Sequence, residues 1–146
     1  MAAGLLKGFD VRLNDKTAIV TGGAGGIGRG ITRAFVKEGA NVLVVDINDE
    51  AGAALVDELG DRVRFLAADL SVESNAEKIV STAVEAFGGL DVLVNNAHAS
   101  RQAPLLDTTQ AMLDLSFNTG FYPTFWLMKA APAQLSTAYP ILVDRH

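Results

Sequence analysis

The chain has 146 residues, of which 49% are hydrophobic and 20% are charged, a composition that is ordinary for one soluble globular domain. Its formal net charge of −5 argues against a nucleic-acid partner, because binding to phosphates requires a basic surface. Without cysteine it has no disulfides, no thiolate chemistry and no cysteine-based zinc site, and its two histidines, His98 and His146, are too far apart in sequence to predict a metal centre.

The N-terminal segment 1–14 contains no apolar run of signal-peptide length. No apolar run elsewhere approaches the ~20 residues that a membrane span requires. We therefore expect a cytoplasmic protein with no membrane partner.

From residue 16 to about residue 95, short β-rich runs alternate with longer segments of helical spacing. The runs 17–20, 41–46, 62–68 and 90–95 are predicted strands, and the continuous apolar character of the first two is typical of buried parallel strands. The predicted helices are 27–38 and 49–59, followed by a helix that begins after residues 71–74 and runs to Phe87. This alternation predicts right-handed βαβ units, and hence an α/β fold with a doubly wound parallel sheet.

Apolar residues within two of these helices recur at helical spacing. Those of the first helix are Ile27, Ile31, Ala34 and Phe35, and those of the third are Ile79, Val80, Ala83, Val84 and Phe87. Ser71 and Ser74 are both candidate N-caps of the third helix.

The remainder of the chain is less regular. Residues 100–104 are a predicted loop, and 108–131 is a long apolar helical stretch that Pro123 should kink or interrupt. Residues 133–146 show no clear period. We therefore expect a nucleotide-binding domain over 1–132 and an irregular tail over 133–146.

The segment 21–28, Thr-Gly-Gly-Ala-Gly-Gly-Ile-Gly, directly follows the first predicted strand and opens the first predicted helix, which is the context that makes such a motif specific. Glycines allow a tight turn and let the backbone approach a pyrophosphate closely. The helix that begins near Ile27 points free N–H groups and a positive dipole end at that phosphate. The motif predicts a dinucleotide site on a Rossmann-type fold, whereas the alternative is a glycine-rich turn without a ligand.

Asp46 ends the second predicted strand, close to the ~20 residues after the last glycine at which a ribose-binding acid is expected. A carboxylate there accepts hydrogen bonds from both ribose hydroxyls and repels a 2′-phosphate, which favours NAD over NADP. No Arg or Lys lies within 22–28 to offset that repulsion. The alternative is a solvated acid at the end of a strand, as we expect for Asp49 and Glu50.

The spacing Thr-Gly-x-x-x-Gly-x-Gly resembles the short-chain dehydrogenase/reductase family. Asp69-Leu70 after the third strand, Gly88 to Val94, and Asn95-Asn96-Ala97 after the fourth strand also resemble that family, and the likeness covers about 13–132. It implies strand order 3-2-1-4, with Asp69-Leu70 beside the adenine ring and Asn95 bracing the sheet. The implied cofactor-binding residues are Gly22, Gly26, Ile27, Gly28, Asp46, Ile47, Asp69, Leu70, Asn96 and Ala97.

The resemblance also implies hydride transfer between NAD and an alcohol/carbonyl pair, for which the family uses a Tyr, a Lys four residues later, a Ser and an Asn. Tyr122 and Tyr139 are followed four residues later by Trp126 and Val143, so we predict no catalytic residue in this chain. Phe117 lies three residues before Gly120, where the family has its Asn. Asn118 is one residue too late, about 100° around a helix, and is either a displaced equivalent or an ordinary polar helix residue.

His98 stands where the family has glycine, and three interpretations stay open: contact with the cofactor, crowding on the nicotinamide side, or a neutral loop residue. The family pattern is lost near residue 133, before the Ser and the Tyr-x-x-x-Lys, so we expect a truncated chain whose fourth strand lies at the sheet edge. In the family the helix over 108–131 is a subunit interface, which implies a homo-oligomer, with aggregation as the alternative.

Three functions therefore remain open from the sequence. The first is an oxidoreductase whose catalytic half is missing from this chain. The second is a non-catalytic NAD-binding or interaction protein, and the third is an inactive fragment. The substrate is not identified.

Overall fold

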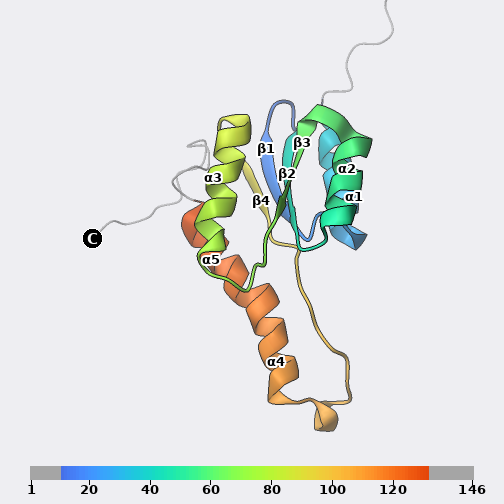
Figure 1. Cartoon of the computed structure of the whole chain (residues 1–146), viewed down its shortest axis with the longest axis vertical. Coiled ribbons are helices and arrows are strands. Elements are labelled where there is room, and N and C mark those ends of the chain that lie inside the picture. Colours follow the sequence, from blue (N-terminus) through green and yellow to red (C-terminus); the bar gives the residue numbers. More distant parts are fainter. Residues whose placement is uncertain (1–10, 132–146) are drawn as a thin grey trace, which may run out of the picture.

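The computed structural model describes residues 11–131, which form a parallel sheet with helices on both faces (Figure 1). Its strands are β1 (Thr17–Thr21), β2 (Asn41–Asp46), β3 (Val63–Ala67) and β4 (Val92–Val94), in the order β3-β2-β1-β4. All three neighbouring pairs are parallel. The predicted α/β fold and its 3-2-1-4 strand order are confirmed, although β4 is shorter than the predicted run.

The helices divide between the two faces of the sheet (Figure 1). On one side lie α1 (Gly26–Lys37) and α2 (Asp49–Leu59), and on the other lie α3 (Asn75–Phe87) and α5 (Tyr122–Ala130). A short 3-10 turn, Gly60–Arg62, joins α2 to β3. Because successive residues of a strand point to opposite faces, the strands contribute to two separate cores. Ile19 and Leu43 pack with α3 and α5, whereas Val20 and Val44 pack with α2.

The buried face of α1 agrees with its apolar pattern only in part, because Ile31 and Phe35 are half-buried against the core while Ile27 and Ala34 are exposed. Ile27 is 79% exposed, and the fully buried residues of this helix are Gly28 and Thr32. The Thr32 hydroxyl donates to the carbonyl oxygens of Gly28, at 3.0 Å, and Gly23, at 3.3 Å. Gly28 and Thr32 are buried because this part of the helix contacts the glycine turn closely, and such contact requires small residues. In α3, by contrast, Ile79, Val80 and Ala83 are buried as the pattern predicts.

Of the two serines predicted as N-caps of α3, Ser74 takes that position and Ser71 does not. Ser74 occupies the N-cap position but makes no capping hydrogen bond with its side chain. The Ser71 hydroxyl instead donates to Asp69 Oδ1, at 2.7 Å. The preceding loop thus uses its serine to fix Asp69, a contact that helix-capping rules do not include.

The helical stretch after the sheet is interrupted where Pro123 predicts. It begins with α4 (Gln110–Ser116), passes through a π-helical turn at Phe117–Phe121 and continues as α5, with Pro123 in its first turn. Proline lacks an N–H and cannot complete the regular bond to the residue four positions earlier, so the helix ladder changes register there. A long loop with a 3-10 turn at Leu105–Asp107 connects β4 to α4, which projects away from the sheet (Figure 1).

No helix within residues 11–131 has both the length and the apolarity to cross a membrane. The predicted tail over 133–146, including Tyr139, lies outside the described residues. The domain boundary near residue 132 therefore stays a prediction.

Candidate functional site

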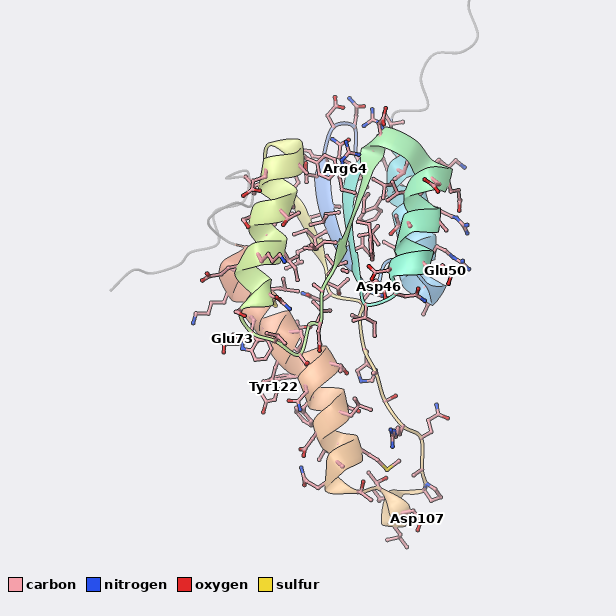
Figure 2. The ribbon with its side chains drawn as sticks, viewed as in Figure 1. Asp46, Glu50, Arg64, Glu73, Asp107 and Tyr122 are labelled. Carbon is pink, nitrogen blue, oxygen red and sulfur yellow. The ribbon has the colours of Figure 1, made fainter. Side chains whose placement is uncertain are left out.

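The candidate site lies at the edge of the sheet where all four parallel strands end. The glycine turn follows β1, Asp46 ends β2, Asp69 comes two residues after β3, and Asn95 follows β4. Asp46 is visible at this edge beside the start of α2 (Figure 2). In an open α/β sheet, ligands bind outside the carboxyl ends of the strands, where the chain connections reverse direction. Here that point lies between β1 and β4.

Two glycines of the turn are required by its geometry. Gly22 has a φ of +62°, in the left-handed region that favours glycine. A Cβ on Gly28 would overlap the carbonyl of Gly22 and lie 2.6 Å from Asn96 Nδ2. The turn therefore folds back on the start of α1 at a distance that no side chain at position 28 permits.

The N-terminus of α1 has no partner of its own in the described chain. Its N-cap is Gly25, which has no side chain, and its first turn contains no acidic residue. A Cβ on Gly25 or Gly26 would meet nothing within 4 Å, so the approach to these N–H groups is open. The open approach and the unpaired donors fit the diphosphate of a dinucleotide, which helix N-termini bind.

Asp46 is held by three backbone N–H groups. Ala24 donates to Oδ2 at 3.1 Å, and Ile47 and Asn48 donate to Oδ1 at 2.8 and 3.2 Å. The carboxylate therefore links the end of β2 to the glycine turn. Because two carboxylate oxygens accept about four hydrogen bonds, it keeps capacity for a ribose hydroxyl.

Asn96 ties the end of β4 to the glycine turn. Its amide donates to the carbonyl oxygens of Thr21, at 2.9 Å, and Gly22, at 3.3 Å. The backbone N–H groups of Asn96 and Ala97 donate to Thr21 Oγ1, at 3.0 and 3.1 Å. The bracing role expected of Asn95 thus belongs to Asn96, since Asn95 lines a hollow instead. Thr21, the first residue of the Thr-Gly-x-x-x-Gly-x-Gly motif, organises this junction, a role that the sequence analysis did not assign to it.

A first hollow lies between the ends of β2, β3 and β4, with a volume of about 180 Å³. That is smaller than the ~300–1,000 Å³ of pockets that hold a whole ligand of drug size, so it suits one part of a dinucleotide. It brings together five of the predicted cofactor-binding residues. Its lining comprises Asp46, Ile47, Ala68, Asp69, Leu70, Ser71, Ala97, His98, Ala99 and Thr119.

Asp69 is fixed in this lining by Ser71. The Ser71 hydroxyl and backbone N–H both donate to Asp69 Oδ1, at 2.7 and 2.9 Å. These two bonds, the hydroxyl foremost, lower the pKa of Asp69 below its ordinary value because they stabilise the carboxylate. At neutral pH the first hollow therefore has an ionised acceptor on its β3 side.

A second hollow adjoins the first on the side of the helical stretch. It is lined by Asn95, Ala97, His98, Ser116, Phe117, Gly120, Phe121 and Thr124. Asn118 is exposed and is not among these residues. Ser116 at the end of α4 and Phe117 of the π-helical turn line this hollow, whereas Asn118, one residue later, does not.

Tyr122 stacks on Trp126, with ring centroids 6.0 Å apart and an interplanar angle of 21°. The residue four positions after this tyrosine therefore provides an aromatic ring instead of a cation.

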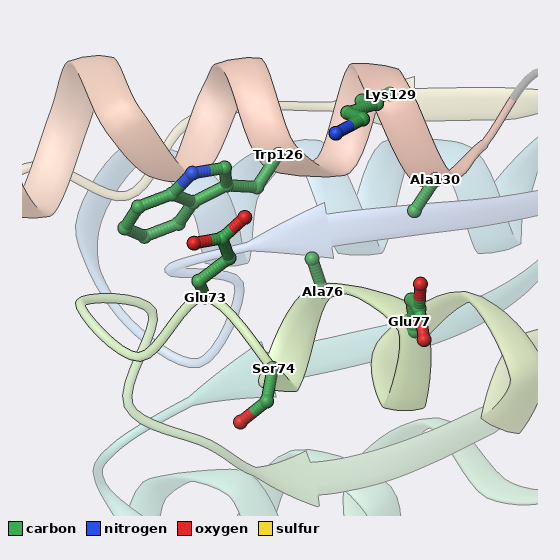
Figure 3. Close-up of a pocket in the computed structure, with 7 residues that line it drawn as sticks. All are labelled: Glu73, Ser74, Ala76, Glu77, Trp126, Lys129 and Ala130. Atoms are coloured by element: carbon green, nitrogen blue, oxygen red, sulfur yellow. The ribbon is translucent and has the colours of Figure 1, made fainter.

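A separate groove lies between α3 and α5, on the side away from the glycine turn (Figure 3). It is lined by Glu73, Ser74, Ala76, Glu77, Trp126, Lys129 and Ala130. None of the predicted cofactor-binding residues lies in it. No sequence motif marks this groove, because it arises from the packing of two helices that are far apart in the chain.

Comparison with known proteins connects these features to one family. The family model described as "short chain dehydrogenase" matches residues 16–139. A sorbitol dehydrogenase from Cereibacter sphaeroides is 37% identical over 120 residues, which cover 82% of this chain and 47% of that protein. A 2,5-dichloro-2,5-cyclohexadiene-1,4-diol dehydrogenase from Sphingobium indicum is 40% identical over 118 residues, covering 80% of this chain and 47% of that protein.

Among solved structures, a short-chain dehydrogenase/reductase described as a glucose/ribitol dehydrogenase, from Brucella melitensis, is similar with a TM-score of 0.81 and 33% sequence identity. The match covers 85% of this chain and 53% of that one. The chain thus spans about half the length of the curated relatives it matches.

Proposed function

The chain belongs to the short-chain dehydrogenase family, and on that premise we propose that residues 11–131 bind NAD, in an oxidoreductase that acts on an alcohol/carbonyl pair. The relatives described above include two dehydrogenases of hydroxylated substrates, which agrees with this reaction class. When bound, NAD would accept the hydride. The residues of this chain would bind and orient it.

One observation above the others supports a dinucleotide site. The glycine turn reaches the start of α1 so closely that position 28 has no room for a Cβ, while the space in front of Gly25 and Gly26 is open. A turn built only to connect a strand and a helix requires neither feature. Both are expected where a backbone must approach a diphosphate and present its N–H groups.

The other predicted cofactor-binding residues lie along the edge of the sheet where the strands end, and their positions assign them to parts of the dinucleotide. We propose that Gly22, Gly26, Ile27 and Gly28 receive the diphosphate, and that Asp46 and Ile47 receive the ribose of the adenosine. Asp69 and Leu70 would lie beside the adenine, and Asn96 and Ala97 would line the path of the cofactor. Ile27 and Ile47 are 79% and 76% exposed, so a bound dinucleotide would cover apolar side chains that otherwise face water.

Asp46 is the residue that we propose selects NAD over NADP, because its carboxylate would repel a 2′-phosphate. Fluorescence titration with NADH and NADPH tests this. We expect the wild-type chain to bind NADH at least tenfold more tightly than NADPH, and Asp46→Asn to reduce that ratio to about threefold or less. An exposed acid in the first turn of α2 supplies the control: Asp49→Asn removes the same charge nearby and should leave the ratio unchanged.

The titration separates the two parts of the proposal. If the wild-type chain binds neither dinucleotide, the site assignment is wrong. If it binds both equally, the site stands but the role of Asp46 does not.

We further propose that the partner of this chain is a second copy, bound through α4, the π-helical turn and α5. Phe121, Phe125 and Met128 follow one another at helical spacing and are 62%, 58% and 59% exposed. An apolar stripe of this kind on a helix is typical of an interaction surface.

A further inference from the structure

His98 stands between the two hollows at the carboxyl edge of the sheet. It lines the first hollow together with Asp46, Asp69 and Leu70, and it also lines the second with Asn95 and Phe117. Its side chain is exposed, and within residues 11–131 no hydrogen bond holds an imidazole nitrogen. The exposed ring therefore lies in the wall that the two hollows share.

The position of this ring depends on Gly120 in the π-helical turn. A Cβ on Gly120 would lie 2.6 Å from His98 Cδ2, closer than two carbons can approach. The adjoining loop is fixed to the same turn, because the Ala99 N–H donates to Thr119 Oγ1 at 2.9 Å and that hydroxyl lies 3.1 Å from the Ala99 carbonyl oxygen. The absence of a side chain at position 120 is what lets the imidazole lie against the helix.

His98 supplies the only aromatic ring in the lining of the first hollow, where the other side chains are aliphatic, small or carboxylate. A purine base presents two flat π-faces, and proteins bind such faces by stacking aromatic side chains on them. The ionised Asp69 on the β3 side adds an acceptor suited to an exocyclic amine. The hollow therefore combines a stacking surface with a hydrogen-bond acceptor, as recognition of adenine requires.

We propose that the His98 imidazole packs on the adenine ring of the bound dinucleotide and that Gly120 is the positioning residue that holds the imidazole there. This inference rests on the proposed function and adds to it one contact that the glycine turn and Asp46 do not provide. It gives the His98 side chain a binding role, and it explains why position 120 is a glycine.

Binding of AMP tests the contact, because AMP contains the adenine ring but lacks the nicotinamide half. By calorimetry we expect His98→Ala to weaken AMP and NAD by a similar factor of about tenfold. His98→Phe preserves a stacking ring and should stay within about twofold of the wild type. Circular dichroism of each variant checks that the fold is intact.

Gly120→Ala tests the positioning role. The new methyl group would displace the imidazole without removing it, and we expect AMP to bind about fivefold more weakly. Gly30→Ala is the matched control, because Gly30 is also helical and a Cβ there would meet nothing within 4 Å. It should leave AMP binding unchanged.

Proton NMR of the imidazole distinguishes direct contact from a structural role. The chain has two histidines, so the His98 signals are identified by their loss in His98→Ala. We expect AMP to shift the His98 Hδ2 signal upfield through the ring current of adenine. Gly120→Ala should shift the same signal in the absence of any nucleotide, and Gly30→Ala should not.

Three outcomes would overturn the inference while the proposed function stands. They are AMP affinity within twofold of wild type in His98→Ala, a loss confined to NAD with AMP unaffected, and a His98→Phe variant as weak as His98→Ala. A wild-type chain that binds neither AMP nor NAD would overturn the proposed function together with the inference.

Discussion

At the scale of single residues, position 28 is the most constrained point of the candidate site. The space that a Cβ would take there is filled by the Gly22 carbonyl and by the Asn96 amide, which also donates to the carbonyl oxygens of Thr21 and Gly22. A side chain there must push the turn away from Asn96. The same displacement would move the N–H groups at the start of α1, so stability and binding are coupled at this position.

We expect Gly28→Ala to lower the melting temperature by several degrees and to weaken NADH binding at least tenfold. Thermal unfolding by circular dichroism and NADH fluorescence measure the two effects. Gly30→Ala, two residues further along the same helix and facing open space, should bind NADH normally and gain up to about 1 kcal/mol of stability from helix propensity. Unchanged NADH binding in Gly28→Ala would contradict the assignment of the turn.

At the scale of secondary-structure elements, the sequence located the strands and helices well because hydrophobic period and glycine stops are local signals. The bounds of β2 and α2 agree with the prediction at both ends. In α1 the pattern found Ile31 and Phe35, which pack on the core, but not the fully buried Gly28 and Thr32. The neighbour of these two residues is the glycine turn, and the fit of Gly28 and Thr32 against that turn depends on backbone geometry that hydrophobicity does not report.

The packing of α5 against α3 predicts how substitutions on the two faces of α5 change the stability of the fold. Leu127 is 1% exposed and packs in the core formed with α3, whereas Met128 is 59% exposed. Leu127→Ala should lower the free energy of unfolding by about 2–5 kcal/mol, as for other buried leucines. Measured at concentrations where the chain is monomeric, Met128→Ala, its neighbour on the outer face, should change it by less than about 0.5 kcal/mol.

Urea unfolding followed by tryptophan fluorescence measures both variants, since Trp126 lies on the same helix and packs against that core. Equal effects of the two substitutions would mean that α5 does not pack on α3 as described.

At the scale of the whole molecule, the outer side of the helical stretch presents apolar side chains to solvent. Phe125 and Phe121 are more than half exposed, and Leu105 and Leu106 in the preceding loop are 87% and 96% exposed. Burial of a phenylalanine is favourable by about 1.5–3 kcal/mol, so a second copy that covers this stripe would be stabilised.

We expect sedimentation velocity to show a discrete dimer that dissociates on dilution. Phe125→Glu should shift it to the monomer at concentrations where the wild-type chain is dimeric, because a carboxylate would be buried without a partner. The exposed Leu106→Glu substitution, in the loop outside this stripe, serves as the control. A wild-type chain that forms a broad range of large species would indicate aggregation and would contradict the proposed dimer.

The sequence by itself determined the parallel fold and the family, and through the family resemblance the strand order, because the signals are short local patterns: the glycine turn after a buried strand, Asp69-Leu70, and Asn95-Asn96-Ala97. The tertiary structure decided which residues meet. It gave the bracing role to Asn96 instead of Asn95, used Ser71 to hold Asp69, and placed His98 against Gly120 at the wall between two hollows. These pairings join strand ends and a helix from distant parts of the chain, and only the packing of the sheet and the π-helical turn brings them into contact.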